Sequence, residues 1–253
     1  MKSLGVLLLI VSLAGCSTAF NNVPGWDDEQ RVELYTRLGL GYMNQDRLAV
    51  ALSSLEEALT IAPQDSPANH AMALLRLRLG EHDNARQSFL TALETDSGNF
   101  AARNDYGSFL CEVGEWTEGI NQYHQALRDP FNTAAHRTQY GLGVCLLGAG
   151  DLLGAQGQLQ AALAARPKAP AVLYQSAVVS FHLEKYLSTR AFLERFFSTG
   201  QVSAESLLLA VRAEHRLGAE DLAAQYAAQL RAGYPASPQA DQLKVLMDNK
   251  GNG

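Results

Sequence analysis

The residue types that most often carry chemistry are sparse in this chain, and they form no familiar catalytic or metal-binding pattern. Six histidines are spread along the sequence without the His-Glu-x-x-His spacing that places two imidazoles on one helix face for zinc. No Gly-x-Ser-x-Gly segment is present to expose a nucleophilic serine. Two Gly-x-Gly segments, 39–41 and 141–143, lack the third glycine of a dinucleotide-binding loop. The sequence therefore predicts a protein that is not an enzyme and needs no cofactor, metal or small-molecule substrate.

Residues 1–15 have the features of a secretory signal peptide. Lys2 supplies a positive charge, and the apolar run that follows is about ten residues long, half of the roughly 20 that a membrane-spanning helix needs. The run ends in Leu-Ala-Gly before Cys16, and this ending resembles the bacterial lipobox. The resemblance implies cleavage before Cys16 and acylation of both its thiol and its new amino group. The alternative is an ordinary signal peptide with an incidental cysteine.

An acylated Cys16 would anchor the protein stably, because several acyl chains bind a membrane firmly whereas one chain binds only marginally. Ser17, rather than Asp, follows the cysteine. In lipoproteins of this kind that residue points to the outer membrane, so the expected location is the periplasmic face of that membrane. Residues 16–31 are then an acylated N-terminus and tether, of which about twelve residues would reach up to ~40 Å.

Most of the remaining chain follows a 34-residue period. Small residues recur at the eighth, twentieth and twenty-seventh positions, as Gly39, Ala51 and Ala58 do in the first window. This is the tetratricopeptide pattern, in which small residues let two antiparallel helices approach closely. The predicted fold is all-α, a right-handed superhelical solenoid of six tetratricopeptide repeats. The repeats are 32–65, 66–99, 100–133, 136–169, 170–203 and 204–237, and 238–253 is a C-terminal extension with a frayed end.

A glycine marks the turn between the two helices in four of the six repeats. These residues are Gly80, Gly114, Gly150 and Gly218, and glycine suits the left-handed position that ends a helix. The fifth repeat is weaker, because Thr189 and Phe196 stand where small residues are expected, and Glu184 replaces the turn glycine. An insertion of two residues separates the third repeat from the fourth.

Two cysteines remain in the repeats. Cys111 and Cys145 both lie late in the first helix of their repeats, the third and the fourth, and these helices should be neighbours. An oxidising periplasm makes a disulfide between them possible. The alternative is a pair of buried free thiols, since cysteine packs as a small apolar residue.

Charge excludes one class of partner. The formal net charge is -6, and lysine and arginine are scattered along the sequence without a basic stripe. Nucleic-acid binding needs clustered positive charge to displace phosphate counterions, so no nucleic-acid partner is expected.

The concave surface of a tetratricopeptide stack is built mainly from the first helix of each repeat. Two positions there, the ninth and the twelfth, are apolar in repeats one, two, four and five, which predicts a partner-binding groove. The residues are Leu40, Met43, Leu74, Leu77, Val144, Leu147, Val178 and Phe181. The first four of them form one compact patch and are expected to contribute most to binding. The alternative is that adjacent helices bury these side chains against each other.

Two segments make a family resemblance specific. Residues 104–111, Asn-Asp-Tyr-Gly-Ser-Phe-Leu-Cys, and residues 140–145, Tyr-Gly-Leu-Gly-Val-Cys, resemble segments of the type IV pilus pilotin lipoproteins, the PilF/PilW family. The resemblance implies an adaptor that binds the pilus secretin subunit, brings it to the outer membrane and promotes its multimerisation, and so supports pilus biogenesis and twitching motility. The alternative is a scaffold lipoprotein of another envelope assembly, such as cell-wall synthesis or outer-membrane protein assembly.

Overall fold

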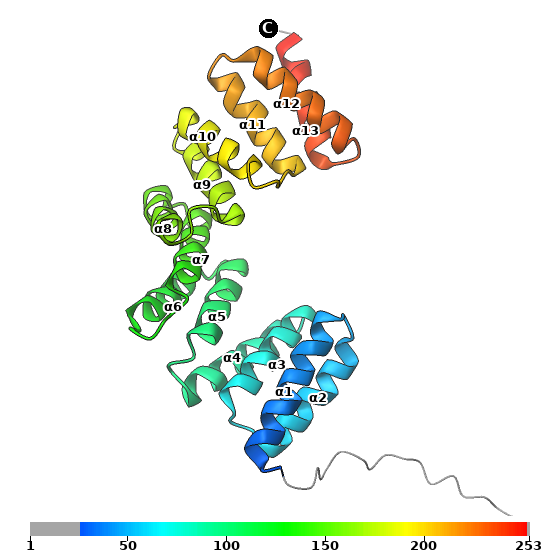
Figure 1. Ribbon diagram of the computed structural model, residues 1–253, viewed down its shortest axis with the longest axis vertical. Helices are drawn as coiled ribbons and strands as arrows, with labels where there is room; N and C mark the ends of the chain where they lie inside the picture. Colours follow the sequence, from blue (N-terminus) through cyan, green and yellow to red (C-terminus); the bar gives the residue numbers. More distant parts are fainter. Residues whose placement is uncertain (1–25, 252–253) are drawn as a thin grey trace, which may run out of the picture.

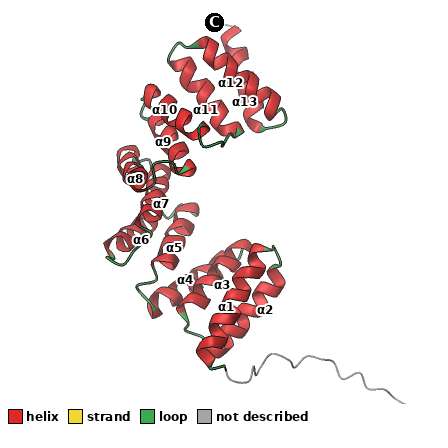
Figure 2. Ribbon diagram, viewed as in Figure 1, coloured by secondary structure: helices red, strands yellow, loops and turns green. Residues whose placement is uncertain are grey.

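The computed structural model describes residues 26–251, so the predicted signal peptide, Cys16 and most of the tether lie outside the described residues. Thirteen α-helices and no strands make up the described chain (Figure 2). The helices are α1 (Asp28–Asn44), α2 (Leu48–Ile61), α3 (Ser66–Arg78), α4 (His82–Thr95), α5 (Phe100–Glu112), α6 (Trp116–Arg128), α7 (Ala135–Gly148), α8 (Leu152–Ala165), α9 (Pro170–His182), α10 (Tyr186–Phe197), α11 (Ala204–Arg216), α12 (Glu220–Gly233) and α13 (Pro238–Gly251).

Consecutive helices pair as six antiparallel hairpins, and the hairpins stack into an elongated, curved solenoid (Figure 1). The odd-numbered helices α1 to α11 are the first helices of the six repeats, and each contacts the next one along the stack. The all-α tetratricopeptide solenoid expected from the 34-residue period is therefore the fold of the protein. The fifth repeat is a complete hairpin despite its weak sequence pattern.

The turn inside each hairpin uses a left-handed residue. Gly80, Gly114, Gly150 and Gly218 have φ values between 72° and 86°, as their positions after the first helices predicted. Glu184 takes the same place in the fifth repeat with φ 59°. Asp46 takes this place in the first repeat with φ 58°. Left-handed backbone costs a residue with a Cβ atom roughly 1–2 kcal/mol, so the first and fifth hairpins have a strained turn that the four hairpins with glycine avoid.

Replacing Glu184 by glycine is expected to raise the free energy of unfolding by about 1 kcal/mol, because glycine adopts the left-handed region without a Cβ penalty. Urea or thermal unfolding of the two proteins would measure the difference. The matched control is Gly150→Ala, at φ 86° with open space around the added Cβ, which should lose a similar amount. Equal stability of all three proteins would contradict the assignment of strain to this turn.

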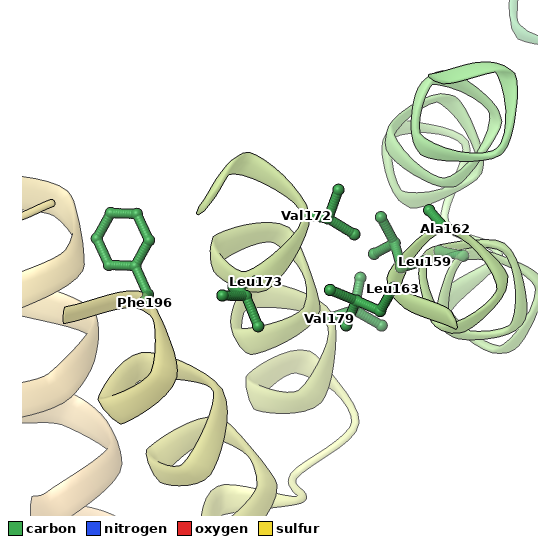
Figure 3. Packing of buried hydrophobic residues seen from close by; sticks show 8 residues of the cluster. Leu159, Ala162, Leu163, Val172, Leu173, Val179 and Phe196 are labelled. Atoms are coloured by element: carbon green, nitrogen blue, oxygen red, sulfur yellow. The ribbon is translucent and has the colours of Figure 1, made fainter. Parts of the chain in front are cut away.

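Small residues allow the helices of one repeat to touch. A Cβ atom on Gly39 would lie 2.5 Å from Cγ of Leu55, so α1 and α2 meet where the side chain is missing. Larger apolar residues fill the space between repeats. Figure 3 shows this in the cluster where Leu159 and Leu163 of α8 face Val172 and Val179 of α9. Burial of this kind, at roughly 25 cal/mol per Å² of apolar surface, is what holds one repeat against the next.

The structure has helical residues on both sides of the predicted repeats. Helix α1 begins at Asp28, inside the predicted tether, because Asp27 and Gln30 form a reciprocal capping box. The segment 238–253, predicted as a C-terminal extension with a frayed end, forms helix α13 up to Gly251. Leu243 of α13 is buried against α11 and α12, so this helix covers the apolar face that the last repeat would otherwise expose.

A disulfide connects the third and fourth repeats. Cys111 of α5 and Cys145 of α7 are bonded, with their Cα atoms 5.6 Å apart. The bond lies in a buried cluster with Tyr123 and Leu142. It joins the two repeats on either side of the inserted residues, across the loop that connects α6 and α7.

Candidate functional site

Two neighbouring hollows lie on the first helices of repeats one to three, and together we name them the A-helix groove. One has a volume of about 420 Å³ and crosses from α1 over α3 to the start of α5. The other, of about 600 Å³, lies between α1 and the α2–α3 connection. Both hollows are lined by Thr36, Leu40 and Pro67, so they form one continuous depression.

The floor of the A-helix groove is apolar. Leu40 is 37 % exposed although it lies within a helix, and Leu74 is half-buried between two core clusters. Between them, Thr36 is buried, and its hydroxyl has no hydrogen-bond partner among the described residues. An apolar depression of this kind, with few polar groups, is the usual form of a surface that binds another chain.

A histidine–carboxylate pair closes one side of the groove. Nε2 of His70 on α3 lies 2.7 Å from Oδ2 of Asp105 on α5. The contact joins the first helices of repeats two and three beside Leu74, so it fixes the width of the groove at this point. His70 is at the fifth position of its repeat, on the concave side, but the sequence contains no signal for its partner, because the two residues are 35 positions apart.

The rim of the groove is acidic. The residues with carboxylates on it are Asp28, Glu29, Glu33, Asp65 and Asp96. Arg37 is the basic residue of the lining, and it lies 3.6 Å from Glu33 in an exposed ion pair. The groove therefore combines an apolar floor with a negative potential at its edge, which favours an occupant with apolar and basic side chains.

The structure divides the four residues of the predicted first patch. Leu40 and Leu74 line the A-helix groove. Leu77 packs against the cluster around Phe89 and lies outside the groove. For Met43 the prediction was wrong, since this side chain is 5 % exposed and belongs to the core between α1, α2 and α3. Met43 is at position 12 of its repeat, near the turn, where neighbouring helices cover it. Leu40 is at position 9, farther from the turn, and lines the groove.

The four residues predicted in repeats four and five lie outside the A-helix groove. Val144, Leu147, Val178 and Phe181 are all half-buried. Leu147 packs against the α8–α9 core, and the Phe181 ring lies 5.5 Å from the ring of Tyr186. These contacts agree with the alternative that neighbouring helices cover apolar side chains on the concave face.

Burial raises the pKa values of several tyrosines on or near the concave face. Burial raises the pKa of Tyr123 to about 12, so its phenol is neutral at physiological pH. Burial also raises the pKa values of Tyr140 and Tyr174 on the concave face. Within residues 26–251 no cluster of His, Cys, Asp and Glu is placed to bind a metal ion. None of the helices described there combines the length and the apolar character needed to cross a membrane.

Comparison with known proteins places this geometry in a family. The tetratricopeptide repeat family profile matches residues 32–65, 70–129 and 110–170. The chain is 30 % identical to the type IV pilus assembly protein PilF of Pseudomonas aeruginosa strain PAO1, over 95 % of this chain and 96 % of the relative.

Two solved structures have the same architecture at similar length. The structure of Pseudomonas aeruginosa PilF is 27 % identical with a TM-score of 0.79, covering 86 % of this chain and 98 % of the other. That of PilW, a widely conserved type IV pilus biogenesis factor, is 26 % identical with a TM-score of 0.81, covering 85 % and 98 %. The chain therefore belongs to the tetratricopeptide repeat proteins and, among them, to the PilF/PilW family of type IV pilus assembly proteins.

Proposed function

We propose that this protein is a pilotin, an outer-membrane lipoprotein that binds the type IV pilus secretin in the periplasm and promotes its localisation and multimerisation. Such an adaptor supports pilus biogenesis and twitching motility. The observation that carries the proposal is the A-helix groove, an exposed apolar depression on a chain whose relatives act in pilus assembly. Tetratricopeptide repeats typically act by binding other proteins, and the groove requires no chemistry of its own.

The groove would contribute affinity and selectivity in different ways. Leu40 and Leu74 would lose contact with water when a segment of the secretin covers them, which is the favourable part of binding. The acidic rim would attract a segment that carries lysine or arginine beside its apolar residues. The lipid on Cys16 would anchor the protein in the outer membrane, and the tether would let the solenoid extend from the membrane to the secretin subunit.

The substitution Leu40→Glu is expected to weaken secretin binding at least tenfold, or about 1.4 kcal/mol, because a carboxylate would replace the apolar floor of the groove. Isothermal titration of the mature chain with the secretin subunit would measure the change. The matched control is Leu38→Glu, since Leu38 on the same helix is 38 % exposed but does not line the groove. Circular dichroism would check that both variants are folded.

In cells, the same variants and Cys16→Ser would be compared by membrane fractionation of the secretin. Loss of outer-membrane multimers with Leu40→Glu and with Cys16→Ser, but not with Leu38→Glu, is the expected result. If Leu40→Glu and Leu38→Glu bound the secretin equally well, the groove would not be the binding site. If the secretin multimers were unchanged in all strains, including one lacking the protein, the pilotin assignment would be wrong.

A further inference from the structure

Charge is distributed unevenly along the solenoid. Residues 26–119 contain seven lysines and arginines against sixteen acidic residues, whereas residues 120–200 contain seven against only four. The acidic first half includes the rim of the A-helix groove. The middle repeats are therefore positive in a protein whose net charge is -6.

The basic residues of the middle repeats gather where second helices end and first helices begin. We name this surface the basic edge, and it consists of Arg128 at the end of α6, Arg137 at the start of α7, Arg166 and Lys168 after α8, and Arg195 near the end of α10. All five side chains are exposed. Because α7 and α8 are antiparallel, their start and end lie at the same edge. Arg195 reaches the same place, since its guanidinium donates to the carbonyl of Pro167 at 2.8 Å.

Few acidic groups oppose the basic edge. None of its five residues takes part in an ion pair within the described part of the chain. The carboxylates at this edge are those of Asp129, Glu194 and Glu205 in the first turn of α11, and Asp129 accepts a hydrogen bond from the backbone of its own loop. The sequence alone did not reveal this clustering, because residues up to 67 positions apart contribute to it.

The α6–α7 loop, which contains the two inserted residues, places an aromatic side chain beside these charges. Phe131 at its tip is 80 % exposed. Hydrogen bonds hold this loop in place. The side-chain amide of Asn132 donates to the carbonyl of Ala126 at 2.9 Å and lies 3.0 Å from the hydroxyl of Thr138. A second exposed apolar side chain, Val202, lies in the α10–α11 loop, which also connects the second helix of one repeat to the first helix of the next.

We propose that the basic edge is a membrane-contact surface that binds anionic phospholipid, with Phe131 inserting between the headgroups. Clustered lysine and arginine are attracted to an anionic leaflet, and an aromatic side chain gains by leaving water for the interface. A bilayer fits the observations better than an acidic protein does. A bilayer accepts the projecting ring of Phe131 without a matching pocket, which a protein partner would have to provide.

This surface is separate from the A-helix groove and does not depend on secretin binding. In the lipidated protein it would complement the anchor at Cys16 by setting how the solenoid lies on the membrane. A test on the unlipidated mature chain separates the two, because any vesicle binding must then come from the folded repeats.

The experiment uses the mature chain with Cys16→Ser and sedimentation with vesicles of phosphatidylcholine, with or without about a third of phosphatidylglycerol. Binding to the anionic vesicles alone, and its loss on raising the salt from about 0.1 M to about 0.5 M, is the expected result. The double variant Arg166→Glu/Lys168→Glu should bind at least tenfold more weakly, and Phe131→Ser about threefold more weakly.

The matched control is Arg47→Glu/Arg212→Glu, which makes the same change in net charge at exposed residues outside the basic edge, one before α2 and one within α11. It should change vesicle binding less than twofold. Equal effects of the two double variants, equal binding to both vesicle types, or no vesicle binding would overturn the proposal. Binding to polyglutamate that requires Arg166 and Lys168, without vesicle binding, would assign the edge to an acidic protein instead.

Discussion

Replacing Arg190 by methionine is expected to lower the free energy of unfolding by about 3 kcal/mol, because it leaves a buried carboxylate without its partner. Glu214 on α11 is 1 % exposed, and Arg190 on α10 is its ion-pair partner. Nε of Arg190 lies 2.8 Å from Oε1 and 3.1 Å from Oε2 of Glu214. The hydrogen bond to Glu214 raises the pKa of Arg190 above its usual value, so the guanidinium stays charged. This pair joins the fifth repeat to the sixth.

Urea unfolding followed by circular dichroism would measure the loss. Lys185→Met is the matched control, since the lysine at the start of the same helix makes only an exposed hydrogen bond to Gln156. It should cost less than about 0.5 kcal/mol. The double variant Arg190→Met/Glu214→Leu should recover most of the stability, because a pair of apolar residues leaves no buried charge. A loss from Arg190→Met no larger than that of the control would show that Glu214 finds water or another donor.

The substitution Gly119→Ala is expected to destabilise the third repeat by about 2 kcal/mol, as overpacking of a close helix contact does. A Cβ atom on Gly119 would lie 3.0 Å from the carbonyl oxygen of Gly107 and would overlap Sγ of Cys111. Neither neighbour can move freely, because one is helix backbone and the other is part of the disulfide to Cys145. The helices α5 and α6 would have to separate to make room.

The comparison for this substitution is Gly157→Ala in α8. Gly157 lies within a helix and a Cβ there would meet no atom within 4 Å, so alanine should raise stability by up to about 1 kcal/mol. Opposite signs for the two substitutions, measured by urea or thermal unfolding, are the expected result. If Gly119→Ala were also stabilising, the close approach of α5 and α6 would not limit the size of this residue.

Much of the fold followed from the sequence, because the signals that encode it are local or periodic. Gly119 is the twentieth residue of the third 34-residue window, a position where the period predicts a close helix contact, and the structure has it there. The left-handed turns at Gly80 and Gly150 followed in the same way. The end of the solenoid was missed, although Ser237-Pro238 is a typical start of a helix, because no repeat pattern continues beyond it.

The candidate site could be predicted only in part. Leu40 and Met43 are both apolar residues predicted on the concave side of one helix, and the sequence pattern groups them in one patch. The structure does, since α3 covers Met43 while Leu40 remains at the surface. The angle between the axes of neighbouring helices decides which of these side chains is covered, and that angle depends on all the side chains packed between the helices.

The sequence by itself determined the repeat, the helix pairs, their turns and the family to which the chain belongs, because each depends on residues within one 34-residue unit or on a linear motif. The tertiary structure decided which residues from different repeats meet. The pair of Arg190 and Glu214, the contact of His70 with Asp105 and the basic edge around Lys168 all join residues more than 20 positions apart. Stacking of the repeats brings these residues together. The 34-residue period alone does not encode which side chains of neighbouring repeats face each other.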